Sequence, residues 1–573
     1  MILFNPNKND FYNHFMKLIL QSRQLLCSNS STNDKIHIIS QFFTPNDLYR
    51  LKEIQYALNQ NCNNQYIHHI HLLNEKIYNS KELGIEHDKI IQTNIGKRLT
   101  FQDVFIYVRR QNISGYIIMI NSDICFNHSI KKILRCSLRE KKQVCCLLRY
   151  EYNKQEPSKS TIFGPRYDSQ DTWIIHSDQM IPIISEKIFS FEFGKPGCDN
   201  KLIYLFSILG YEIFNDPKTI QTYHIHDSKQ RNYSIRDAVK LPVGVIIPYG
   251  FQMKDLKQNL GINLRKYISW SNNFENISFD NNNMLREYIV DKFRQQQNFI
   301  IPRMSGIENN VAVFSRVIHQ NLHHDIQSLR SYIKKTLKAM KNNAGISLTS
   351  ENSVLYYSNL YLSAFDQSEI YASWEPQGEY IKHISQSHSY MLNTYQTKKR
   401  FWAYNFDIFH YIYNNPWTWA LKNKRILLIS PFEATLREQI PNRQFVYDNI
   451  DLFPNCEFIF LKPPQTQADE LSADFSIEFD KFKDNVNELL DQFDVALVSC
   501  GGYGNPICAH IYAKGKSAIY VGGVLQMYFG ILGNRWIQER NDIVQLFYND
   551  FWKRPKPNEK PKNCNKVENA CYW

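Results

Sequence analysis

One acidic residue and two histidines occur at spacings that could build a metal site. The segment 116–123 reads YIIMINSD, an apolar run that ends in Asn121, Ser122 and Asp123. In a strand, alternate residues share a face, so we expect Asn121 and Asp123 on the same side. A carboxylate at the carboxyl end of a parallel strand sits where ligands bind, and one such group with a substrate diphosphate often holds Mg²⁺ or Mn²⁺. An ordinary turn is the alternative for this tripeptide.

The two histidines follow about a hundred residues later. TIQTYHIH, residues 219–226, is typical of a strand, which would place His224 and His226 on one face. A His-x-His pair needs a third ligand, and Asp123 would supply an oxygen beside two nitrogens. This mixed donor set suits Mn²⁺.

Asp199 is the candidate for proton transfer. It follows the loop GKPG and precedes a helical pattern that ends at Gly210. At a helix start it would either cap the helix or act as a general base toward an acceptor hydroxyl. We expect the helix end to keep this carboxylate ionised, because the dipole favours an anion there.

The elements that must position these residues follow a clear order. Apolar strand patterns at 35–43, 66–75, 115–126 and 143–152 alternate with amphipathic helical patterns up to about residue 234. This alternation predicts a parallel α/β sheet. A polar, Asn-rich stretch follows, and four more strand patterns separated by helical stretches then predict a second α/β domain.

The first domain resembles the GT-A fold glycosyltransferases. The resemblance rests on the order of the apolar strand, NSD, DSQDTWIIH, FGKPGCDNKLIYLFSILGYEIFN and HIH. It implies that Asp123 matches the last Asp of a DxD motif, with Asn121 in place of the first. It further implies that Asp199 is the base of an inverting enzyme and that His224 or His226 completes a divalent metal site.

Three further residues fit that resemblance. Arg98 would offset diphosphate charge, or serve only as a cation near a helix end. Asp171 and Trp173 would form the acceptor wall, with Asp171 binding hydroxyls and Trp173 stacking on a sugar ring. Core packing is an equal alternative for Trp173.

The second domain carries two weaker signals. Gly501, Gly502 and Gly504 follow a strand pattern and precede a helix, where backbone N–H groups can cradle a phosphate; a tight turn that needs glycine is the equal alternative. FIIPRMSGIENN resembles the RFGDGE signature of GT-D fold glycosyltransferases. Arg303 and Glu308 match its Arg and Glu, which implies nucleotide-sugar binding.

We therefore predict two Rossmann-like α/β domains, GT-A-like and GT-D-like, joined by a polar, partly helical linker. The predicted parts are an N-terminal helical segment 1–34, a glycosyltransferase domain 35–235, a linker 236–299, a C-terminal α/β domain 300–552 and a mobile tail 553–573.

Composition limits the partners. The 573 residues carry a net charge of +12, which suits phosphate-bearing ligands, but the basic residues are spread out and no nucleic-acid motif occurs. The 12 cysteines form no CxxC pair, and no signal peptide or membrane span is expected, so we expect a cytoplasmic protein. The expected function is transfer from a UDP- or GDP-linked sugar to a glycan or glycoprotein hydroxyl. A non-catalytic glycan- or nucleotide-binding protein is the alternative.

Overall fold

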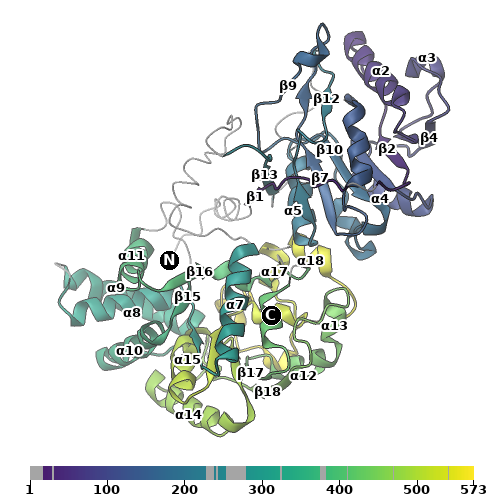
Figure 1. Ribbon diagram of the computed structural model, residues 1–573. Helices are drawn as coiled ribbons and strands as arrows, with labels where there is room; N and C mark the ends of the chain where they lie inside the picture. The colour runs from purple at the N-terminus through teal and green to yellow at the C-terminus, as the bar shows by residue number, and fades with distance from the viewer. Residues whose placement is uncertain are drawn as a thin grey trace. The chain divides into compact units, whose positions relative to one another are not determined.

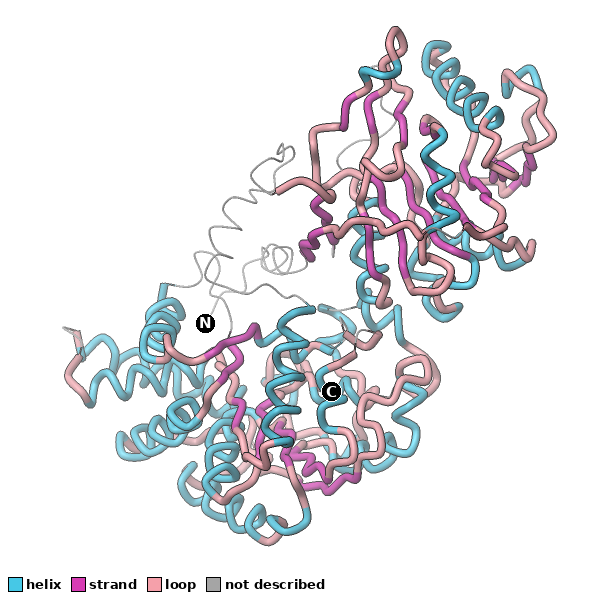
Figure 2. The backbone as a smooth tube through the Cα atoms, viewed as in Figure 1, coloured by secondary structure: helices cyan, strands magenta, loops and turns pink. Residues whose placement is uncertain are grey.

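The computed structural model describes residues 17–28, 31–227, 238–239, 243–252, 279–322, 325–373, 382–408, 411–413, 415–468, 470–539 and 541–573. The chain divides into two compact units, Met1–Arg265 and Lys266–Trp573. Each unit has its own sheet (Figure 1). Each also has its own buried apolar core. The predicted α/β class is confirmed, because both main sheets are built mostly of parallel strands (Figure 2).

The N-terminal unit is built on a seven-stranded sheet. Its order is β11 (Glu212–Phe214), β7 (Gln143–Leu147), β10 (Thr172–His176), β5 (Tyr116–Ile120), β2 (Ile36–Ser40), β3 (His69–Asn74) and β4 (Ile90–Asn94). Only β10 runs antiparallel to its neighbours. The strands β2, β5, β7 and β10 are buried along their whole length, as strands covered on both faces must be.

Among the described residues of this unit, the α-helices are α2 (Leu48–Asn63), α3 (Ser80–Leu83), α4 (Phe101–Arg110) and α5 (Cys198–Ile208). The start of α4 shows why the sequence forms a helix there. Thr100 and Asp103 form a reciprocal capping box, and Arg109 and Arg110 occupy the last turn, where the helix dipole favours cations.

A second, smaller sheet carries the histidines. Its order is β6 (Ile124–Phe126), β12 (Thr222–His224), β8 (Tyr150–Glu151) and β9 (Thr161–Ile162). The antiparallel pairing of β12 with β6 places His224 opposite Ile124. Because β6 begins directly after Asp123, this register brings His224 beside that carboxylate.

The beginning of the chain differs from the prediction. Residues 1–16 lie outside the described residues, and the predicted helical segment instead contains the strand β1 (Lys17–Gln21). It pairs in parallel with β13 (Val243–Ile247), which packs against α5. The partner strand is distant in sequence, so local propensity could not reveal this pairing.

The C-terminal unit holds a five-stranded, fully parallel sheet. Its order is β14 (Ile300–Ile301), β20 (Ser517–Tyr520), β19 (Val495–Val498), β17 (Arg425–Ile429) and β18 (Glu457–Leu461). A parallel pair, β15 (Ile370–Ser373) and β16 (Lys399–Trp402), forms a separate sheet.

Helices make up much of the rest of this unit. They are α7 (Phe279–Arg294), α8 (Ile307–His319), α9 (Ile326–Ala339), α10 (Glu351–Gln367), α11 (Lys382–Thr394), α12 (Glu433–Gln439), α13 (Arg443–Val446), α14 (Phe475–Asn487), α15 (Gly504–Ala513), α16 (Leu525–Tyr528), α17 (Asn534–Glu539) and α18 (Asn541–Phe547). The helix α7 lies within the predicted linker, of which residues 236–237, 240–242 and 253–278 lie outside the described residues. Every helix in the described parts of the chain is too short or too polar to span a bilayer.

The predicted mobile tail is instead packed against the C-terminal unit. Glu559 is 3% exposed, and its Oε1 accepts hydrogen bonds from the backbone N–H groups of Ala434 and Thr435 at 2.8 and 3.2 Å. These groups open α12, where a carboxylate is favoured by the helix dipole. Trp573 is also buried, and its Nε1 donates to Glu559 O at 2.9 Å.

Candidate functional site

Asp123 lies in the turn between β5 and β6, and its carboxylate is buried. Its Oδ2 accepts hydrogen bonds from Arg50 Nη2 and from His224 Nε2, the latter at 3.2 Å. Its Oδ1 is also buried and has no hydrogen-bond partner among the described residues. Burial opposes ionisation, but His224 and Arg50 hold the pKa of Asp123 well below its usual range. Asp123 is therefore a buried anion, one oxygen of which has no hydrogen-bond partner among the described residues.

The two histidines converge on this carboxylate. One ring nitrogen each of His224 and His226 and one oxygen of Asp123 lie within 4.8 Å of one another. The other ring nitrogen of His224 is 3.4 Å from Glu151 Oε2, which orients the imidazole. One carboxylate and two imidazoles suit Mn²⁺ or a similar divalent ion. With the unpartnered Asp123 Oδ1, these residues fit such a metal.

The protonation of His224 reflects the same neighbours. Burial lowers the pKa of His224, but the Asp123 and Glu151 carboxylates outweigh it and raise that pKa to about 9. At neutral pH His224 is thus an imidazolium, and it must lose a proton before it can ligate a metal.

Arg50 is a cation of the chain that already contacts these ligand atoms. It lies in α2, donates to Asp123 Oδ2 and to Glu53 Oε2, and its Nη1 is 2.5 Å from His226 Nδ1. The side chains of Arg50 and Glu53 are 13% and 3% exposed. Sequence reasoning missed this pair, because Arg and Glu three residues apart on a helix usually mark a solvated face.

A chain of ion pairs connects the histidines to Asn121. Glu151 accepts from Arg149 Nε at 3.0 Å, and Arg149 also donates to Asp171 Oδ2. Asp171 Oδ1 in turn accepts from Asn121 Nδ2 at 2.8 Å. Because β10 is antiparallel, Asp171 at its start lies at the edge where β5 and β7 end. Asn121 and Asp171 were predicted separately, whereas the linking residues Arg149 and Glu151 were not predicted.

Asp199 occupies the first turn of α5, two residues after the N-cap, so it does not cap the helix. The N-cap is Gly197, with φ of 79°, and Asp199 accepts from the backbone N–H groups of Asn200 and Gln170 at 2.9 and 3.1 Å. Burial raises the pKa of Asp199 to about 7, the two backbone N–H groups oppose this, and Asp171 adds to it. The expectation that the helix end keeps Asp199 ionised is therefore wrong, because desolvation outweighs the helix N-terminus.

Arg98 lies beside Asn121 and is held by its own neighbours. Its Nη2 donates to Phe193 O at 2.7 Å, and its Nε is 3.6 Å from Glu192 Oε2. A Cβ on Gly194 would lie 3.4 Å from Arg98 Nη2 and 4.0 Å from Asn121 Oδ1. Arg98 is therefore near the carboxyl edge of the sheet where Asn121 and Asp123 follow β5.

Trp173 does not line the site. It is fully buried in β10, and its ring contacts Phe101 and Phe193 edge-on. A ring without an exposed face cannot stack on an acceptor sugar. Core packing, the alternative for Trp173, accounts for this residue.

The glycine turn of the C-terminal unit is filled by protein atoms. It follows β19 and opens α15. A Cβ placed on its glycines would meet neighbouring atoms at less than 3 Å: Ala344 O at 2.8 Å from Gly501, Ile346 Cγ1 at 2.3 Å from Gly502 and Tyr520 Cε2 at 2.2 Å from Gly504. Close packing thus explains why all three positions are glycine. It replaces the interpretation of this turn as a phosphate cradle.

Arg303 and Glu308 lie at the start of the same unit. The backbone N–H of Arg303 donates to Asn505 Oδ1 at 3.1 Å, and its Nη1 donates to Val521 O at 3.1 Å. Glu308 is in the first turn of α8; burial raises its pKa, and Arg303 acts to lower it. The structure thus brings the two residues into electrostatic range of each other.

Comparison with known proteins gives only distant likenesses. No family model and no curated protein matches the sequence. The solved structures that resemble part of the chain include the mannosyltransferase PcManGT from Pyrobaculum calidifontis in complex with GDP-Man and Mn²⁺. Its TM-score is 0.27 at 7% identity, over 36% of this chain and 61% of that one.

Two further structures are a glycosyltransferase involved in the glycosylation of the major capsid of PBCV-1 and the mannosyltransferase Ktr4p from S. cerevisiae. The first has a TM-score of 0.19 at 12% identity, over 34% of this chain and 95% of that one. The second has a TM-score of 0.15 at 12% identity, over 27% and 51%. All three neighbours are glycosyltransferases.

Proposed function

We propose that the N-terminal unit is a glycosyltransferase of the GT-A type. It moves a sugar from a nucleotide-diphospho-sugar to an acceptor hydroxyl. The observation that supports this most is the convergence of Asp123, His224 and His226, whose ligand atoms lie within 4.8 Å of one another. Asp123 and His224 are 101 residues apart in sequence, so the fold itself must assemble this group.

The proposed metal ligands are Asp123, His224 and His226, with Mn²⁺ or Mg²⁺ as the ion. Such an ion would neutralise charge on the leaving diphosphate. The buried Asp123 Oδ1, which has no partner among the described residues, is the atom best placed to bind it. The Arg50 guanidinium must then leave Asp123 Oδ2 and His226 Nδ1, or share the site.

Asp199 is the proposed general base. Its raised pKa, about 7, lies near the operating pH, where a base is most effective. In the ionised form it would accept the proton of the acceptor hydroxyl as that oxygen attacks the sugar. A base separate from the leaving diphosphate implies a single displacement, so we infer inversion at the anomeric carbon.

Donor and acceptor would meet near Asn121. Arg98 is the cation beside Asn121, and we assign it to the donor diphosphate of a UDP- or GDP-linked sugar. Asp171 holds Asn121 and Arg149 through its two oxygens, so its proposed role is to fix this edge of the acceptor site. The acceptor would be a glycan or glycoprotein.

For the C-terminal unit we propose a GT-D-like second transferase or acceptor-binding domain. Its support is the proximity of Arg303 and Glu308 at the start of α8. The chain would then be bifunctional or carry its own acceptor module.

One observation favours a second candidate, a nucleotide- or glycan-binding protein without turnover. Arg50 contacts two of the three proposed ligands, Asp123 and His226, and a fixed cation there would replace the metal. Such a protein would still bind a diphosphate through Arg50 and Arg98.

A donor screen tests both candidates. Purified chain is incubated with UDP- and GDP-linked sugars, with and without Mn²⁺, and free nucleotide is measured. We expect Mn²⁺-dependent release from one donor, reduced at least about tenfold in His226→Gln, since second ligands commonly matter 10- to 100-fold. The exposed His128→Gln is the matched control. Mn²⁺-independent thermal stabilisation by UDP or GDP, without release from any donor or added acceptor glycan, would instead support the binding protein.

A further inference from the structure

A second histidine cluster lies in the N-terminal unit, away from Asp123. His37 is in β2, and His69 and His71 are in the adjacent parallel strand β3, with His37 paired to His69. One ring nitrogen from each of the three lies within 4.8 Å of the others. His37 and His69 are near the amino ends of their strands, whereas Asp123 follows the carboxyl end of β5. The histidine cluster therefore lies at the amino ends of the strands, and Asp123 lies at the carboxyl ends, on the opposite side of the sheet.

The distances within the cluster approach those of a metal site. His37 Nδ1 and His71 Nε2 are 3.1 Å apart. Two nitrogens bound at about 2.0–2.1 Å in a tetrahedron lie about 3.3 Å from each other. His69 is the third member, and its ring forms no hydrogen bond with any described residue. Small side-chain rotations would therefore bring three imidazole nitrogens onto one ion.

A neighbouring hydroxyl orients one of the imidazoles. The other ring nitrogen of His71, Nδ1, is 3.1 Å from the Tyr107 hydroxyl of α4. Donation of the Nδ1–H to this oxygen leaves the Nε2 lone pair facing His37. Metal-bound histidines are commonly held in this way from their second nitrogen.

The cluster is chemically suited to a transition metal. Burial lowers the pKa of His37 to about 3 and that of His71 to about 4, so both are neutral at physiological pH. Neutral imidazole is the form that ligates, and three imidazoles favour zinc, copper or nickel over Mg²⁺ and Mn²⁺. Lys35 is close enough to lower the pKa of His37 as well, so it would moderate the affinity for a cation.

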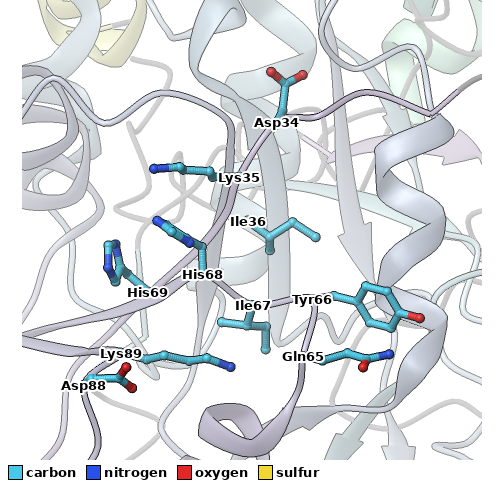
Figure 3. Close-up of a pocket in the computed structure, with 10 residues that line it drawn as sticks. All are labelled: Asp34, Lys35, Ile36, Gln65, Tyr66, Ile67, His68, His69, Asp88 and Lys89. Carbon is cyan, nitrogen blue, oxygen red and sulfur yellow. The ribbon is translucent and has the colours of Figure 1, made fainter.

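An opening leads to the cluster. A pocket of about 410 Å³ is lined by His68 and His69, together with Asp34, Lys35, Asp88 and Lys89 (Figure 3). His69 is the member of the cluster that is only partly buried and that borders this pocket. Because the pocket reaches His69, it would give an ion and a fourth, exchangeable ligand such as water access to this side chain.

We propose that His37, His69 and His71 form a zinc-binding site with three imidazole ligands. It is separate from the Mn²⁺ or Mg²⁺ site of the proposed transferase and does not depend on it. Its bound ion would link β2 and β3 at the amino edge of the sheet. The competing interpretation is a metal-free hydrogen-bonded series of His37, His71 and Tyr107.

The test uses the full chain, stripped with a chelator and titrated with Zn²⁺ against a chromophoric chelator. His69→Ala is the main variant because this side chain is the least buried of the three, and the exposed His319→Ala is the matched control. A His226→Gln background removes a ligand of the other candidate site. We expect His69→Ala to lose one zinc equivalent, or to bind it at least tenfold more weakly, in both backgrounds, while His319→Ala binds as the wild type does.

A second set of measurements tests the proposal even if the His69→Ala variant does not fold. Co²⁺ added to the stripped wild-type protein is expected to give the visible absorption of a tetrahedral site, and Zn²⁺ to abolish it. Zn²⁺ should also raise the melting temperature of the wild type more than that of His69→Ala. Equal zinc content and equal thermal shifts in wild type and His69→Ala, or no tetrahedral Co²⁺ absorption in the wild type, would overturn the proposal.

Discussion

Asp199 is the proposed general base, and burial is the main influence on its pKa. Burial raises this pKa to about 7, so the folded protein holds a carboxyl that ionises near neutrality. We expect Asp199→Asn to lower transfer about 10²- to 10⁴-fold, the usual contribution of a general base. In the wild type, kcat/KM should rise with pH through a midpoint near 7, because only the ionised form accepts a proton. Steady-state kinetics from pH 5.5 to 8.5 measure both effects.

The matched control is Asp474→Asn, a helix cap in the C-terminal unit. It should leave the rate and its pH midpoint unchanged. A midpoint near 7 that persists in Asp199→Asn would show that another group is the base.

The same raised pKa predicts a stability change with a defined sign. Between about pH 4, where an unfolded aspartate ionises, and pH 7, the folded group stays neutral, so wild-type stability falls as pH rises. Asp199→Asn removes this loss. After allowance for solvent screening and one weakened hydrogen bond, we expect it to be about 2 kcal/mol more stable than the wild type above pH 7. Denaturant unfolding should show this difference vanish toward pH 4; a constant difference would contradict it.

Arg50 balances the buried Asp123 when no metal is bound. Arg50→Ala leaves that carboxylate with only His224 as a cation, and removal of one partner of a buried pair typically costs about 3–5 kcal/mol. We expect a lower melting temperature without metal and a larger Mn²⁺-induced rise than in the wild type. Arg294→Ala, whose side chain is 71% exposed, is the control. If Mn²⁺ stabilises wild type and Arg50→Ala equally, Arg50 does not compete for the site.

Some residues of the candidate site could be predicted from the sequence, because both their side-chain type and their position at a strand end indicate a ligand site. Asp123, His224 and His226 each follow or end a strand, and the register of β12 on β6 then brings them together. Arg50 and Glu53 could not be found in this way, because their sequence pattern is that of an exposed helix pair. Trp173 was wrongly predicted to line the acceptor wall. A tryptophan in a strand gives the same sequence pattern whether it packs in the core or binds a sugar.

Elements with dense apolar runs were predictable, and those that depend on distant pairing were not. The patterns at β2, β3, β5 and β7 are nearly uninterrupted, as buried parallel strands require. The strand β1 forms only because β13 pairs with it from far along the chain. The segment before Lys35 therefore offered no reliable local signal.

The support of α5 by β13 can be tested through a glycine. A Cβ on Gly244 would lie 2.7 Å from Ile203 Cγ2 and 2.9 Å from Tyr204 N in α5. We expect Gly244→Ala to destabilise the protein by about 1–3 kcal/mol through overpacking. It should also slow transfer, because a shift of α5 moves Asp199. Gly306→Ala is the control, since its Cβ meets no atom within 4 Å and its φ is −79°. Wild-type stability and rate in Gly244→Ala would contradict this view of α5.

At the scale of the whole molecule, composition alone led to the wrong prediction that residues 553–573 form a mobile tail. Residues 553–573 are rich in lysine and proline, a composition typical of mobile tails. Several of their side chains, among them Glu559, Val567, Cys571 and Trp573, are nevertheless buried. These buried side chains hold the segment in place, and its average composition does not reveal them.

Glu559 offers a way to perturb one unit while leaving the other intact. Its buried carboxylate accepts from Ala434 N, Thr435 N and Lys556 N, and from the Thr435 hydroxyl. In Glu559→Gln the new amide nitrogen faces donors, so one charged hydrogen bond or more is lost, at about 2–4 kcal/mol. Since each unit has its own core, calorimetry should show two unfolding transitions, of which Glu559→Gln lowers only one.

Glu488→Gln, at the exposed C-cap of α14, is the matched control and should shift neither transition. Nucleotide release by the N-terminal unit should be the same in wild type and Glu559→Gln at temperatures below the lowered transition. That result would assign donor chemistry to the unit that holds Asp123. A parallel loss of nucleotide release and of C-terminal stability would contradict this assignment.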